Sequence, residues 1–160
     1  MPEPASPRRF LVPVDHPHGS SDAIAVASYL ARAVNGSLTL LAVVPLAVPP
    51  AGIADTGTIP VTLSAPERQE TIDRLARERL DEVAGGIGDD LDVRTELSWG
   101  PAGPAIVDAV NEHGYDLVVV PSRREGTLGH LVHDHAVRQV LHHSPVPVLV
   151  VPTDDALHDG

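Results

Sequence analysis

The segment from Asp116 to Pro152, DLVVVPSRREGTLGHLVHDHAVRQVLHHSPVPVLVVP, limits the possible folds of this chain more than any other feature. Two short runs rich in valine and leucine, at 117–120 and 147–151, enclose a loop and a stretch at 136–142 with helical character. A strand that is apolar at nearly every position is buried on both faces. The segment therefore predicts two parallel strands joined by a crossover helix, with right-handed connections.

The same alternation of strands and helices runs through the rest of the chain. The sequence predicts strands at 10–14, 37–44, 92–97, 117–120 and 147–151. It predicts helices at 22–34, at about 65–84, from the glycine and proline cluster at 100–104 to His113, and at 136–142. Ser64 and Glu67 form a capping-box pattern before the second helix. We expect this helix to turn four apolar residues inward: Ile72, Leu75, Leu80 and Val83.

This order predicts an α/β fold, a three-layer α/β/α sandwich around one parallel sheet. In such sheets a ligand binds beyond the carboxyl ends of the strands, where the strand order reverses. That rim should contain Asp15, Val44, Gly100 and the loop that follows Val120. Residues 45–64, with four prolines and two glycines, form a long irregular connection.

Composition bounds the domain organisation and the compartment. We expect one domain at 9–152 between disordered tails at 1–8 and 153–160. With 42% hydrophobic and 2% aromatic residues, its core must be aliphatic. The absence of cysteine excludes disulfides, thiolate metal sites and a cysteine nucleophile, and suits a cytoplasmic protein. No apolar run approaches the roughly 20 residues that span a bilayer, and the first ten residues do not form a signal peptide.

The charge pattern excludes two classes of partner. The formal net charge is −11, and all 11 basic residues are arginine. Such a surface repels nucleic acid and anionic membranes at long range. Abundant carboxylates without lysine also suggest the salt-rich cytoplasm of a halophile, although a GC-rich genome gives the same preference for arginine.

Five short segments, in this order and spacing, resemble the universal stress protein family. They are LVPVD at 11–15, SLTLLAVV at 37–44, Gly100 with Ile106 and Val107, DLVVVPSRR at 116–124 and VLHHSPVPVLVVP at 140–152. The resemblance covers residues 9–152. It implies a Rossmann-like fold of the adenine nucleotide alpha hydrolase type, with five parallel strands in the order 3-2-1-4-5. It also implies a homodimer that pairs the last strand, between Val146 and Val151.

The resemblance further implies a nucleotide site with an altered phosphate loop. Members that bind ATP carry G-x-x-G, nine residues, then G-S/T. Aligned on Ser122–Arg123 and on Pro145–Pro147, Arg124 and Thr127 stand at the two loop glycines and Asp134 and His135 at the final pair, with six residues in place of nine between Thr127 and Asp134. Pro121 also removes an amide donor near the loop. The positions that would contact ATP or AMP are Asp15, Val43, Val44, Ser122, Arg123, Gly126 and His135.

Histidine and tryptophan supply the remaining candidate residues. His130, His133 and His135, with an aspartate between the last two, could hold zinc or nickel, but their spacing matches no established signature. Surface histidines are the simpler reading. Trp99 could stack on a ligand base or pack beneath the 45–64 connection.

The sequence favours a non-enzymatic, stress-linked regulatory or interaction protein that needs no cofactor and is not an efficient ATP binder. An alternative is an adenine-nucleotide-binding module with an altered phosphate loop. A third hypothesis is a metal-dependent enzyme that uses the cluster from His130 to His135.

Overall fold

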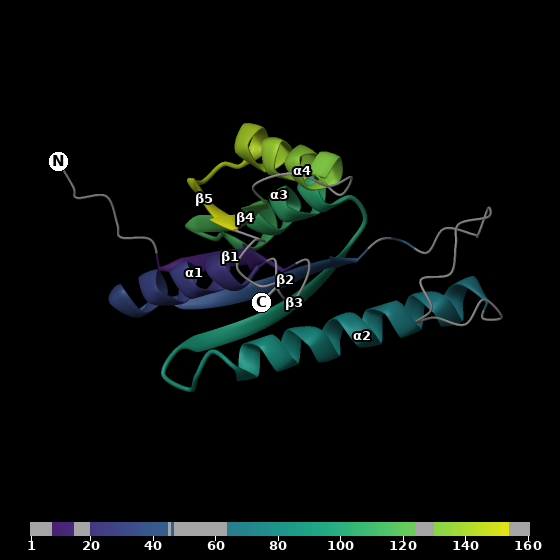
Figure 1. The fold of residues 1–160 in the computed structure, drawn as a ribbon, viewed down its shortest axis with the longest axis horizontal. Coiled ribbons are helices and arrows are strands. Elements are labelled where there is room, and N and C mark those ends of the chain that lie inside the picture. The colour runs from purple at the N-terminus through teal and green to yellow at the C-terminus, as the bar shows by residue number, and fades with distance from the viewer. Residues whose placement is uncertain (1–7, 15–19, 45, 47–63, 124–129, 154–160) are drawn as a thin grey trace, which may run out of the picture.

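A computed structural model describes residues 8–14, 20–44, 46, 64–123 and 130–153, with the backbone alone at 123 and 130–134. Its five parallel strands form one sheet in the order β3-β2-β1-β4-β5. Helices cover both faces of the sheet, α1 and α2 on one side and α3 and α4 on the other (Figure 1). The predicted three-layer fold and strand order are confirmed.

The elements follow the predicted order with small shifts at their ends. The strands are β1 (Arg9–Pro13), β2 (Ser37–Val44), β3 (Asp92–Trp99), β4 (Leu117–Arg123) and β5 (Val148–Thr153). The helices are α1 (Ser21–Ala33), α2 (Ala65–Gly85), α3 (Ala102–His113) and α4 (His130–His143). Beginning at His130, α4 is longer than the predicted 136–142, and β4 continues through a proline where the prediction ended it.

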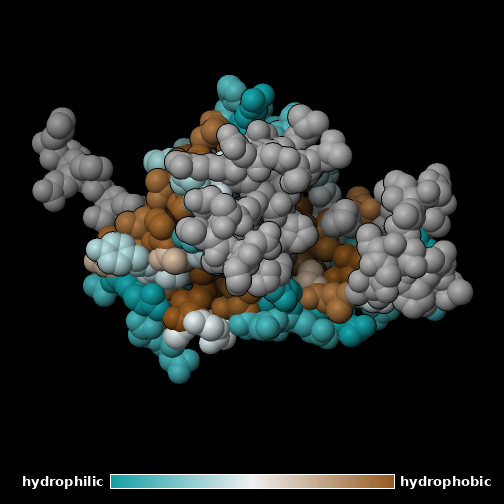
Figure 2. All heavy atoms as spheres, viewed as in Figure 1, coloured by the Kyte–Doolittle hydropathy of each residue, from teal (hydrophilic) through white to brown (hydrophobic). Residues whose placement is uncertain are grey.

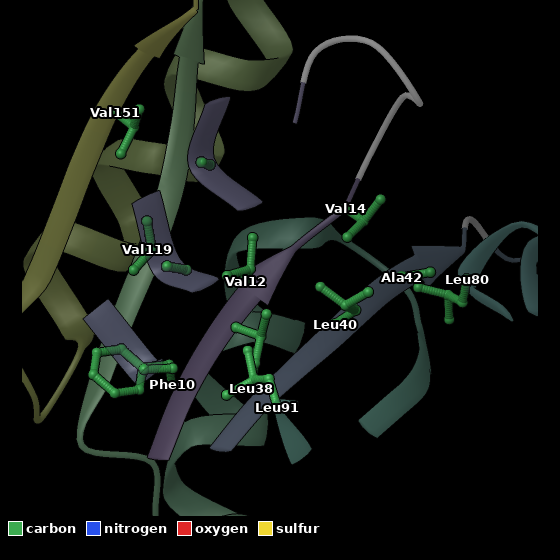
Figure 3. Close-up of a cluster of buried hydrophobic side chains, with 13 residues drawn as sticks. Phe10, Val12, Val14, Leu38, Leu40, Ala42, Leu80, Leu91, Val119 and Val151 are labelled. Atoms are coloured by element: carbon green, nitrogen blue, oxygen red, sulfur yellow. The ribbon is translucent and has the colours of Figure 1, made fainter. Parts of the chain in front are cut away.

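The period of two along each strand divides the core between the two faces of the sheet. Phe10, Val12 and Leu40 point toward α1 and α2, where they pack with Leu80 and Val119 (Figure 3). The alternate positions face α3 and α4 and form a second cluster, which includes Leu11, Leu41, Val118, Val120, Ile106 and Val140. Apart from Phe10 in the first cluster and Tyr115 in the second, the buried side chains of both clusters are aliphatic, in line with the low aromatic content.

Helix α2 begins with a complete N-terminal cap, and Leu80 is its buried residue. The Ser64 hydroxyl accepts the Glu67 N–H, and the Glu67 side chain accepts the Ser64 N–H at 2.8 Å, so the predicted capping box is present. Among the four predicted inward residues, Leu80 is fully buried, but Leu75 is 37% exposed. The helix packs mainly against β2 and β3, and its N-terminal end reaches past the strands (Figure 1). Its outer side forms the hydrophilic lower edge of the molecule (Figure 2).

Candidate functional site

A cavity of about 340 Å³ lies at the carboxyl ends of the central strands, beneath α3 and α4. Its position agrees with the predicted rim, because the strand order reverses between β1 and β4. The described residues that line it come from three strands, the residue after β1, two helices and the β3–α3 connection: Pro13, Val14, Leu41, Val43, Gly100, Pro101, Ala102, Ile106, Val120, Pro121, Ala136, Val137 and Val140.

The cavity lies where β1 and β4 separate. Pairing between these strands ends at Leu11 and Val118, although β1 still pairs with β2 as far as Pro13. The Val14 N–H donates to the Leu41 carbonyl of β2 at 2.7 Å. Because neighbouring residues of a strand turn their amides to opposite sides, the backbone of Pro13 faces β4.

The facing position of β4 is also a proline. The Val118 N–H donates to the Pro147 carbonyl at 3.1 Å, so the backbone of Val118 faces β5. The direction alternates along the strand, so the backbone of Pro121, three residues later, faces β1. The next two bonds of the ladder would run from the nitrogen of Pro13 to the Val119 carbonyl and from the nitrogen of Pro121 to the Pro13 carbonyl. Proline has no N–H, so neither bond can form. The two prolines thus leave β1 and β4 unpaired where the cavity begins. We call this unpaired stretch between Pro13 and Pro121 the open seam.

The connection from β3 to α3 closes one end of the cavity. Gly100 has a φ of +103°, a conformation that residues with a Cβ rarely adopt. Its N–H donates to the Val44 carbonyl at 3.0 Å, so the chain leaves β3 while still bonded to β2. Pro101 is the N-cap of α3, and the first helical N–H groups, those of Ala102 and Gly103, have no partner within the helix.

The roof of the cavity depends on a close approach of α3 and α4. A Cβ placed on Gly103 would lie 2.8 Å from the Cβ of Gln139 on α4. The absence of a side chain at Gly103 therefore allows the two helices to meet. Their contact brings Ile106 of α3 and Val140 of α4 into one buried cluster over the sheet.

The described lining has no titratable or charged side chain. Groups with shifted pKa values lie away from it. The Arg32 guanidinium lowers the pKa of Asp90 through a hydrogen bond of 2.7 Å, and the Ser64 hydroxyl lowers the pKa of Glu67. Among the described residues, the cavity therefore offers apolar surface and backbone groups, not acid–base chemistry.

The predicted nucleotide contacts fall on different parts of this site. Val43 lines the cavity, whereas the Val44 carbonyl is already bonded to Gly100. Ser122 lies in β4 opposite Pro152, beyond the residues that line the cavity. Arg123 pairs through its backbone with Thr153 of β5. The predicted contacts Asp15 and Gly126 lie outside the described residues, and contact with a nucleotide stays a prediction for the whole set.

The predicted histidine cluster gains no support from the side chains that the structure describes. His135 is exposed on α4, and no group of three or more potential metal ligands occurs in the described ranges. The side chains of His130 and His133 lie outside the described part of the chain. A metal site there stays a prediction.

Trp99 lies on the side of the sheet away from the cavity. It is the last residue of β3, where it pairs with Val44. Its indole N–H donates to the Asp73 carboxylate of α2 at 2.9 Å, and 43% of its surface is exposed. Trp99 is not among the described residues that line the cavity, and stacking on a ligand base stays a prediction. Strand alternation at the end of β3 places it instead against α2.

One polar cluster has no counterpart in the sequence predictions. The Tyr115 hydroxyl donates to Glu96 of β3 at 3.0 Å, and His113 Nε2 lies 3.0 Å from the other carboxylate oxygen of Glu96. The Arg9 guanidinium lies over the Tyr115 ring, 5.2 Å from its centroid. Burial raises the pKa of the Tyr115 phenol. No local motif joins these residues, because the fold alone brings together segments from three regions of the chain.

Comparison with known families identifies the fold. The chain matches the model of the universal stress protein family over residues 7–152. The chain belongs to the universal stress protein family. Comparison with the curated proteins gave no match.

Solved universal stress proteins share the architecture at low identity. The protein UspA from Lactobacillus plantarum is 23% identical with a TM-score of 0.70, and the alignment covers 92% of this chain and 99% of that one. A family member from Burkholderia pseudomallei is 18% identical with a TM-score of 0.68, covering 94% and 100%. A universal stress protein from Archaeoglobus fulgidus, solved in complex with dAMP, is 14% identical with a TM-score of 0.60, covering 89% and 96%.

Proposed function

We propose that this universal stress protein is a non-enzymatic regulatory protein that holds a small molecule in the cavity beneath α3 and α4. It binds ATP weakly or not at all. The observation that carries the proposal is the cavity itself, which lies at the strand-order reversal yet has an apolar described lining. A site of this size and position suits a ligand. The lack of acid, base or nucleophile in the described lining argues against catalysis.

The sequence of the phosphate loop supports the weak ATP binding. Glycines in such a loop let backbone amides approach phosphate oxygens closely. This chain carries Arg124, Thr127 and Asp134 instead, and the carboxylate would repel a phosphate at short range. The net charge of −11 opposes an anionic ligand at longer range as well.

Calorimetric titration with MgATP in molar potassium chloride tests the proposal. We expect a dissociation constant weaker than micromolar for the native chain. Arg124→Gly should tighten binding because it removes the side chain at a loop position, whereas the control Arg124→Ala removes the same charge but keeps a Cβ. A micromolar or tighter constant for the native protein would contradict the proposal.

A second candidate function is an adenine-nucleotide-binding module with an altered phosphate loop. It is favoured by the dAMP complex of the Archaeoglobus fulgidus relative and by the cavity, whose wall includes Val43 at the end of β2. Arg123 and Gly126 would then serve a shifted loop. Native mass spectrometry of the purified protein separates the two candidates, since a copurified nucleotide would favour the second.

The assembly and the setting belong to the same proposal. No helix in the described ranges is long and apolar enough to cross a membrane. Among the described strands β5 pairs with β4 alone, which leaves its outer edge available for pairing with a second copy between Val146 and Val151. We propose a cytoplasmic homodimer, in a salt-rich cell if the lysine-free acidic composition reflects halophily.

A further inference from the structure

The polar groups of the cavity point to a ligand of particular chemistry. The Pro13 carbonyl faces Pro121 across the open seam, so it has lost the donor that a parallel ladder normally supplies. Both prolines line the cavity. A buried carbonyl without a partner is costly, and a ligand N–H or O–H that reaches it would be favoured.

Donors are few in the described lining. Pro13, Pro101 and Pro121 have none, and the amides of Val14 and Gly100 are bonded to carbonyls of β2. The amides of Ala102, which lines the cavity, and of Gly103 beside it have no partner within α3. They suit one acceptor atom, because Pro104 has no N–H and the Ala105 N–H bonds to the Pro101 carbonyl at 3.1 Å.

The charge of the ligand is a second criterion for binding in this cavity. A charged ligand would exchange water for aliphatic walls that carry no counter-charge among the described residues, and burial of an unpaired charge is far more costly than that of a neutral group. The partial positive charge at the start of α3 amounts to about half a unit. It acts against a formal charge of −11 on the chain.

We propose that the cavity binds an uncharged, predominantly apolar molecule that donates a hydrogen bond to the Pro13 carbonyl. This inference rests on the proposed function and names the ligand class of that site. Nucleotides fall outside the class because they are anionic. The volume of about 340 Å³ is at the small end of ligand pockets, which fits one or two fused rings.

Three probes of similar size separate the contributions of the hydrogen bond and of charge to the binding affinity. Indole has an apolar body and one N–H donor, 1-methylindole lacks the donor, and indole-3-carboxylate adds a charge. Methyl NMR titrations of Ile106 and Val137 report binding inside the cavity. We expect indole to bind about five-fold more tightly than 1-methylindole, the usual value of one neutral hydrogen bond. We expect it to bind roughly ten-fold or more tightly than the carboxylate. Molar salt in the buffer screens the long-range charge, so that the difference reports the cavity.

Two variants test the location and the acceptor. Ala136→Leu fills the cavity from α4 and should abolish the indole shifts, whereas His142→Leu adds the same side chain at an exposed position of that helix and should not. Pro121→Ala restores an N–H opposite the Pro13 carbonyl, so it should bring the affinities for indole and 1-methylindole together. The ratio of the two affinities is the readout, because a change in the shape of the cavity would alter the affinities for both ligands.

The outcomes also separate this inference from the proposed function. Equal binding of indole and 1-methylindole by the native protein, or tighter binding of indole-3-carboxylate or AMP, would overturn the neutral-donor class while weak ATP binding still stood. Unchanged indole shifts in Ala136→Leu would overturn the location. Tight ATP binding together with absent indole binding would remove both proposals.

Discussion

The close approach of α3 and α4 gives a stability prediction whose magnitude follows from the structure. In Gly103→Ala, the new Cβ would lie 2.8 Å from the Gln139 Cβ and 3.0 Å from its Cδ. The end of the Gln139 side chain can rotate away, but its Cβ is fixed to the backbone of α4, so the helices must move apart. Overpacking of this kind costs about 1–3 kcal/mol, and alanine regains at most about 1 kcal/mol over glycine in a helix.

We therefore expect a net loss of about 1 kcal/mol, which lowers the melting temperature by about 2–4 °C in a domain of this size. Gly85→Ala is the matched control, because Gly85 ends α2 and a Cβ there would meet nothing within 4 Å. Thermal melts followed by circular dichroism compare the two. A Gly103→Ala variant as stable as Gly85→Ala would refute the reasoning.

A double-mutant cycle isolates the contact itself. Gln139→Gly removes the Cβ that blocks the new methyl group, although it weakens α4 by about 1 kcal/mol on its own. If the clash between the two Cβ atoms explains the loss, the Gly103→Ala/Gln139→Gly protein should be more stable than the sum of the single effects predicts. Strict additivity would place the cause elsewhere.

The remaining predictions concern salt, pH and assembly. The melting temperature should rise between 0.1 M and 3 M potassium chloride, because salt screens the repulsion within a chain of net charge −11 and strengthens aliphatic burial; a flat or falling curve would contradict this and the halophile proposal. The Ser64 hydroxyl lowers the pKa of Glu67, so the ionised cap stabilises the fold at pH values above the ordinary glutamate pKa. This stabilisation is lost as pH falls through the folded-state pKa, so Glu67→Gln should flatten the acid side of a stability–pH curve. Burial raises the pKa of Tyr115, so its neutral form contributes stability that is fully present below the unfolded pKa of about 10. This contribution is lost as pH rises through the folded-state pKa, so Tyr115→Phe should reduce alkaline unfolding in a pH melt. Leu149→Lys places a charge at an exposed site of β5 and should leave only monomers in light scattering, and a persistent dimer would locate the interface elsewhere.

The order of elements was readable from the sequence because it depends on local patterns. The apolar run at 37–44 and the capping box at Ser64 and Glu67 specify a strand and a helix start by themselves. Partners across the sheet were not readable in this way. That Pro13 faces Pro121 follows only from two hydrogen-bond registers, and the contact of Tyr115 with Glu96 needs the folded chain.

Some errors had a physical cause that the sequence conceals. Leu75 fits the apolar stripe of α2 but is 37% exposed, on a helix whose N-terminal end reaches past the strands (Figure 1). The sequence predicts a strand that ends at Val120, whereas β4 continues through Pro121. At this position the missing N–H faces the open seam, where β1 offers no pairing, so the strand continues.

The open seam also bears on the order in which the chain folds. It divides the sheet into β3-β2-β1 and β4-β5, and within each part parallel pairing joins strands that are consecutive in the chain. The recorded pairs that unite the parts are Phe10 with Leu117 and Leu11 with Val118, at sequence separations near the 107 residues between Arg9 and Asp116. Closing so long a loop has a high entropic cost, and the few backbone hydrogen bonds between β1 and β4 offset only a small part of it. We therefore expect the docking of two preformed half-sheets to be the slow step of folding, with β1 and β4 the last neighbours to meet.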